Sequence, residues 1–180
     1  MFDESLHYHT VSNSDAVAEI FYLATNQKEL ERVLNTALEL DMPFQVLGSD
    51  ISDSDKKRKK IDGLVIKNRT HLIKISGIKG KFVVGSMGID QVLLEVDSGV
   101  TLKDLQDYFV KNKLVQPLFA SNEKLTFGES LVHEFGIQGL LENIRVWEKG
   151  VIEEISILEF QPKKQIVLSA VIRAKSIQIV

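Results

Sequence analysis

Apolar residues between positions 30 and 38 recur at the spacing of one helical face, which predicts an amphipathic helix. The apolar positions are Leu30, Val33, Leu34, Ala37 and Leu38. Asn26 and Glu29 stand just before this face with the spacing of a capping box, in which Asn26 accepts from the helix and Glu29 reaches back to it. Pro43 prevents the helix from continuing.

Short apolar runs after this helix predict strands at residues 44–47 and 64–66. A helix that leads directly into a short buried strand favours an α/β lobe. Residues 71–96 are rich in strand-forming residues and are interrupted by glycines, so we expect a meander of antiparallel strands at 71–75, 81–84 and 91–96. The expected turns lie at Gly77, Gly80, Gly85 and Gly88.

Thr101 has the position of an N-cap for a second helix, which we expect to run to about Lys113. Its expected buried side consists of Leu102, Leu105, Phe109 and Val110. Two further strands are expected at 152–160 and 165–173, with a turn at Pro162. The order of elements predicts an α+β fold of two packed lobes: a small α/β lobe at 1–70, and a lobe with an antiparallel sheet and helices at 71–180.

The composition narrows the classes of function. The chain has 180 residues, of which 44% are hydrophobic and 26% charged, as in ordinary globular proteins. A formal net charge of −3 gives no indication of nucleic-acid or membrane partners. The absence of cysteine excludes disulfides, a thiolate nucleophile and Cys-ligated metals. Without a visible signal peptide or an apolar run of about 20 residues, we expect a cytoplasmic protein.

Candidate catalytic and metal-binding patterns are weak. His7 and His9 would share one face of a strand and could bind a metal, but an exposed polar end is the interpretation we favour. His133 and Glu134 lack the second histidine of a zincin motif, and Gly48 does not begin a P-loop. The basic run at 56–60 follows three aspartates that largely neutralise it, so a solvated loop is the better interpretation. We therefore predict neither catalytic nor metal-binding residues.

Residues 42–50 and 61–68 form a helix–strand–loop–strand pattern that resembles the first FAD-contacting loop of the UDP-N-acetylenolpyruvoylglucosamine reductase (MurB) family. The segments 94–105, 140–146 and 166–173 resemble later parts of the family in the same order. The resemblance implies a two-lobed FAD-binding domain of the PCMH, or vanillyl-alcohol-oxidase, type. It also implies a relation to the NADPH- and flavin-dependent reduction of UDP-N-acetylglucosamine enolpyruvate in peptidoglycan synthesis.

The residues that the resemblance places along the flavin are Leu47, Gly48, Ser49, Asp50, Ile51, Thr126, Phe127 and Gly128. Such loops are normally glycine-rich because the diphosphate needs close approach of backbone amides. Here acidic residues, Asp50 and Glu129, stand where the family has glycine-rich runs, and like charges repel.

The family's Tyr-Arg-x-Ser element is missing at 160–165, and its third, substrate-binding domain would begin beyond Val180. We therefore expect no turnover by this chain alone. Three alternatives follow: a domain that still holds FAD, a cofactor-free relative that acts as a binding or interaction module, and a cleft that takes a smaller nucleotide or sugar nucleotide.

Overall fold

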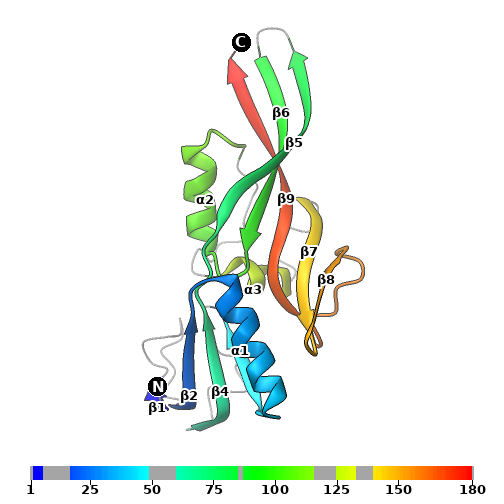
Figure 1. Ribbon diagram of the computed structural model, residues 1–180. Coiled ribbons are helices and arrows are strands. Elements are labelled where there is room, and N and C mark those ends of the chain that lie inside the picture. The colour runs from blue at the N-terminus through cyan, green and yellow to red at the C-terminus, as the bar shows by residue number, and fades with distance from the viewer. Residues whose placement is uncertain are drawn as a thin grey trace.

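The computed structural model describes residues 2–5, 17–48, 60–84, 87–115, 125–132 and 140–179. Figure 1 shows an elongated molecule, with one sheet at the end that carries the N-terminus and strands of a second sheet reaching to the opposite end. The first sheet contains β1 (Phe2–Ser5), β2 (Val17–Ala24), β4 (Lys60–Asn68) and β3 (Phe44–Leu47), in that order across the sheet. Both β2 and β3 run parallel to β4.

The second sheet is antiparallel throughout and has the order β5-β6-β9-β7-β8. Its strands are β5 (Ile73–Val84), β6 (Met87–Asp97), β9 (Ile166–Ile179), β7 (Leu141–Glu148) and β8 (Val151–Ile155). A small, mainly parallel sheet beside a larger antiparallel one confirms the predicted α+β fold class.

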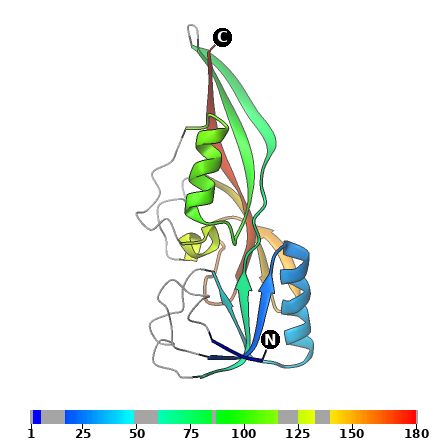
Figure 2. The same ribbon diagram turned by 90° about the vertical axis from the view of Figure 1, so that its left-hand side faces the viewer.

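The first predicted helix is α1 (Gln27–Glu39), and it covers one face of the first sheet (Figure 2). Asn26 caps it as expected and accepts from the amide of Glu29 over 3.0 Å. The Glu29 carboxylate, however, reaches back to the amide and hydroxyl of Thr25, both at 2.8 Å, and not to Asn26. Asn26 is therefore the N-cap, as predicted, but the Glu29 carboxylate binds the residue before it.

The predicted meander is simpler than expected, because a single long strand, β5, replaces the strands predicted at 71–75 and 81–84. Gly77 and Gly80 are not turns; they lie where the pairing register between β5 and β6 shifts. Gly88 is part of β6, opposite Val83, and Gly85 lies outside the described residues. Glycine tolerates the irregular backbone of such a β-bulge, so it interrupts the ladder without reversing the chain.

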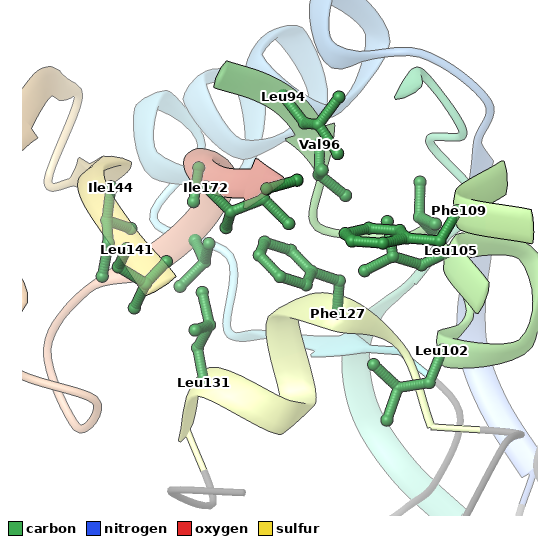
Figure 3. Close-up of a cluster of buried hydrophobic side chains, with 14 of the residues drawn as sticks. Leu94, Val96, Leu102, Leu105, Phe109, Phe127, Leu131, Leu141, Ile144 and Ile172 are labelled. Carbon is green, nitrogen blue, oxygen red and sulfur yellow. The ribbon is translucent and has the colours of Figure 1, made fainter. Parts of the chain in front are cut away.

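The second helix, α2 (Leu102–Lys111), is capped by Thr101, which accepts from the amide of Asp104 over 3.1 Å. Val110, expected on its buried side, is 67% exposed. A short helix, α3 (Phe127–Val132), follows. Figure 3 shows side chains from α2, α3 and the second sheet meeting in the main core. The labelled members are Leu94, Val96, Leu102, Leu105, Phe109, Phe127, Leu131, Leu141, Ile144 and Ile172.

The strands between residues 151 and 179 differ in length from the prediction. β8 ends at Ile155, and residues 157–159 form a turn in which the Ser156 amide donates to Glu159 over 2.9 Å. β9 continues six residues beyond the predicted end at 173, to Ile179. The turn at 162–164 lies where Pro162 predicted it.

Candidate functional site

The two segments that the sequence placed along a flavin meet directly. Gly48 follows the last residue of β3, Thr126 directly precedes α3, and Glu129 belongs to the first turn of that helix. A Cβ atom built on Gly48 would lie 2.4 Å from Thr126 Oγ1 and 2.5 Å from Glu129 Cδ. No side chain fits at such distances, so this contact requires glycine at position 48.

The first turn of α3 is closed by its own capping box. The amide and the hydroxyl of Thr126 both donate to Glu129 Oε2, at 2.9 Å each. The Glu129 amide donates in turn to Thr126 Oγ1 over 3.3 Å. Reciprocal bonds of this kind satisfy donors that a helix otherwise leaves unpaired at its N-terminus.

A buried lysine supports the same contact from the first sheet. Lys67, near the end of β4, is 4% exposed, and its ammonium group donates to the carbonyl oxygen of Gly48. Burial of a lysine is costly unless its charge is paired or hydrogen-bonded. The bond therefore fixes the end of β3 to β4.

A turn between β6 and α2 holds the other side of α3. The Gly128 amide donates to Ser98 O over 2.8 Å, and the Phe127 amide donates to Val100 O over 2.7 Å. A Cβ on Gly128 would stand 2.9 Å from the Ser98 Cβ. The Phe127 side chain points into the main core, on the Phe109 side of the cluster (Figure 3).

Buried polar side chains connect the two sheets beneath this turn. Asn68 Nδ2 donates to Ser98 Oγ over 2.8 Å, and the Thr70 hydroxyl donates to Asn68 Oδ1 over 2.9 Å. The Gly99 amide donates to Thr70 Oγ1 over 3.0 Å. These groups are bonded to one another, which is what makes their burial tolerable.

Asp97 is the buried carboxylate of this region. It accepts from Gln27 Nε2 over 2.6 Å and from the Leu72 amide over 2.9 Å. Burial raises the pKa of Asp97 above its ordinary value, and the two hydrogen bonds only partly oppose that shift. Gln27 also accepts from Arg145 over 2.8 Å, so the network links α1 to both β6 and β7.

Five of the eight sequence-predicted flavin residues are described by the structure. Leu47 is buried, Gly48 meets Thr126, and Phe127 and Gly128 bond the turn before α2. Ser49, Asp50 and Ile51 lie outside the described residues, as do His7 and His9.

The sequence interpretation missed other members of the site. These are Lys67, Asn68, Thr70, Asp97 and Ser98. The Thr126–Glu129 spacing carried a readable signal, because Thr-x-x-Glu is the pattern of a capping box.

The described residues form neither a metal-binding cluster nor a membrane-spanning helix. Among them, no group of three or more His, Cys, Asp or Glu side chains could hold a metal ion. In the same part of the chain, no helix is both long and apolar enough to cross a membrane.

Solved structures show what the fold is similar to. Cholesterol oxidase from B. sterolicum has a TM-score of 0.62 at 12% identity over 88% of this chain. The Bermuda grass isoallergen BG60 gives 0.63 at 14% identity over 96%, and alkyldihydroxyacetonephosphate synthase gives 0.59 at 14% over 88%. No protein-family model matches, and neither does a curated protein.

The matched proteins are much longer, since this chain spans only 34% to 38% of their lengths. Identities this low show the fold alone. That fold is the two-lobed α+β arrangement of PCMH-type FAD-binding domains, as the sequence predicted.

Proposed function

We propose that this chain is a MurB-related domain of the PCMH type that retains the scaffold without holding FAD and acts as a binding module. The relation to MurB rests on the order of its sequence segments, and the fold of its structural neighbours is compatible with it. The missing Tyr-Arg-x-Ser element at 160–165 supports the absence of turnover by this chain.

The contact between Gly48 and Glu129 carries this proposal. A flavin diphosphate is bound by close, glycine-rich backbone and by free amides, often at a helix N-terminus. At α3 the Glu129 carboxylate already bonds the amide of Thr126 and fills the space beside Gly48. A diphosphate at this position would meet both a filled space and a like charge. The described residues therefore do not fit that group.

The second candidate is a domain that still binds FAD, and the fold likeness to FAD-binding enzymes favours it. An absorbance spectrum of the purified protein, recorded before and after incubation with excess FAD and desalting, separates the two candidates. We expect no flavin bands after desalting. Bands that persist through desalting would show that the proposal is wrong.

Glycine substitutions test the physical cause. Changing Ser49, Asp50 and Glu129 together to glycine removes the two acidic groups, so we expect FAD retention to rise in this triple variant. Glu29→Gly is a matched control, because Glu29 bonds the amide and hydroxyl of Thr25 just before α1, as Glu129 bonds the amide and hydroxyl of Thr126 just before α3. It should leave FAD retention unchanged. A triple variant that folds yet stays colourless would show that the carboxylates are not what excludes the flavin.

A further inference from the structure

A pocket of about 280 Å³ lies between α1 and the first sheet, apart from the contact at Gly48. It is lined by Ile20, Tyr22, Arg32, Val33, Thr36, Ala37, Leu40, Met42 and Leu64. None of the residues that meet at Gly48 contributes to it. The pocket is therefore a separate candidate site.

The way α1 lies on the sheet accounts for this pocket. Leu30, Leu34 and Ala37 of the helix pack with Leu64 and Ile66 of β4. Side chains alternate between the faces of a strand, so Ile20 and Tyr22 of β2 face the helix while Phe21 joins a small cluster that does not include α1. Ile20 and Tyr22 are only half-buried, which leaves room beside the helix.

The pocket lining combines apolar side chains with a single positive charge. Most of its side chains are apolar, and its single ionic group is the guanidinium of Arg32, which donates to the Tyr22 hydroxyl over 3.3 Å. None of the lining residues is acidic. Of the acids nearest to Arg32 along α1, Glu31 pairs with Arg145 at 3.1 Å. Glu29 accepts mainly from Thr25, and the charge of Arg32 adds a smaller contribution to the lowering of the Glu29 pKa.

We propose that this pocket binds a short aliphatic carboxylate, with its head group at Arg32 and its alkyl chain among Ile20, Val33, Ala37, Leu40, Met42 and Leu64. Guanidinium groups bind carboxylates through charge-assisted hydrogen bonds, and the apolar lining takes up the chain. The volume of about 280 Å³ lies just below the usual range for small-molecule pockets, roughly 300–1,000 Å³, so a chain of about eight carbons is a suitable probe.

Titration calorimetry with octanoate tests the proposal, with hexanoate and 1-octanol as reference ligands. Octanoate should bind more tightly than hexanoate, by about threefold to fourfold for each added methylene that is buried. Absence of octanoate binding, or equal affinity for hexanoate and octanoate, overturns the proposal.

The head group is tested at Arg32. Arg32→Gln should weaken octanoate binding by about fivefold to tenfold and leave 1-octanol binding unchanged, because only the carboxylate uses the charge. Lys28→Gln is the matched control, since Lys28 is an exposed cation on the same helix that does not line the pocket. Equal losses in both variants would assign the effect to general surface charge, and no loss in Arg32→Gln would show that the carboxylate does not use Arg32. Either result overturns the proposed head-group contact.

The position of the chain is tested by filling the pocket. Thr36 is exposed and lines the pocket, so Thr36→Phe adds a ring there without disturbing the buried face of α1. We expect octanoate and 1-octanol both to lose most of their affinity, with the circular dichroism of the folded protein unchanged. Undiminished binding to this folded variant would place the ligand elsewhere and overturn the proposal.

Discussion

The indole N–H of Trp147 donates to Asn35 Oδ1 over 2.7 Å and so joins β7 of the second sheet to α1 on the first. Trp147 is 4% exposed, and its ring meets the ring of Phe44 edge-on, with centroids 5.8 Å apart and planes at 72°. Edge-to-face contacts of this kind are favourable beyond the area that they bury. Trp147 of the second sheet thus contacts both α1 and β3 of the first lobe. The Trp147–Asn35 hydrogen bond therefore offers a test of how the lobes hold together.

Replacing Asn35 by alanine should destabilise the protein by about 1–3 kcal/mol, because the buried indole N–H would lose its acceptor. For a chain of this size, each kcal/mol lowers the melting temperature by roughly 2–4 °C. Asn35→Asp keeps an acceptor at the same place and should cost less. Thermal unfolding followed by tryptophan fluorescence measures both variants, and equal losses would show that the hydrogen bond is not the cause.

The local elements were predictable where the sequence carries its own signal. The apolar spacing and the cap at Asn26 predicted α1, and Thr101 correctly marked the start of α2. The role of Gly77 could not be predicted, because a glycine in an apolar run fits either a turn or a bulge. The choice between them depends on the partner strand β6, which is distant in the sequence.

The candidate site was predictable only in part, for a similar reason. Family resemblance brought Gly48 and Thr126 to notice, but it did not show that the Glu129 carboxylate would lie against Gly48. Lys67 resembled an ordinary polar residue at the end of an apolar strand, and no local pattern indicated that it would be buried and donate to the carbonyl oxygen of Gly48, 19 residues earlier in the chain. Contacts between distant segments determine such sites, and local patterns do not record them.

The close approach of Gly128 to Ser98 gives a second prediction. A Cβ at position 128 would stand 2.9 Å from the Ser98 Cβ and 3.1 Å from the Ser98 carbonyl oxygen, so Gly128→Ala must push α3 away from the turn before α2. Overpacking of this kind typically costs about 1–3 kcal/mol. Urea denaturation of the variant measures the loss.

Gly77→Ala is the control for that loss. The nearest atom to a Cβ at position 77 is the Leu93 Cδ1 at 3.8 Å, an ordinary contact, so this change should cost little or even stabilise the protein slightly. A Gly128→Ala protein as stable as the wild type would show that α3 can shift freely and that its contact with the turn contributes little.

The pH dependence of stability should carry opposite contributions from Asp97 and Glu29. Burial is the largest effect on Asp97 and raises its folded-state pKa above the ordinary 3.8, and the nearby charge of Glu95 raises the pKa further. The hydrogen bonds from Leu72 and Gln27 and the charge of His71 lower the pKa, but only in part. The folded state therefore binds the Asp97 proton more tightly than the unfolded state does. Its contribution to stability is fully present below pH 3.8 and is lost as the pH rises through the folded pKa.

Hydrogen bonds from Thr25 lower the pKa of Glu29 from 4.5, so its contribution is present above that pH and is lost as the pH falls through the folded pKa. Urea denaturation between about pH 3.5 and 7 measures both contributions. As the pH rises, the unfolding free energy of the wild type should fall relative to Asp97→Asn and rise relative to Glu29→Ala. If the unfolding free energy of the wild type instead rose with pH relative to that of Asp97→Asn, hydrogen bonding to the ionised carboxylate would outweigh its burial.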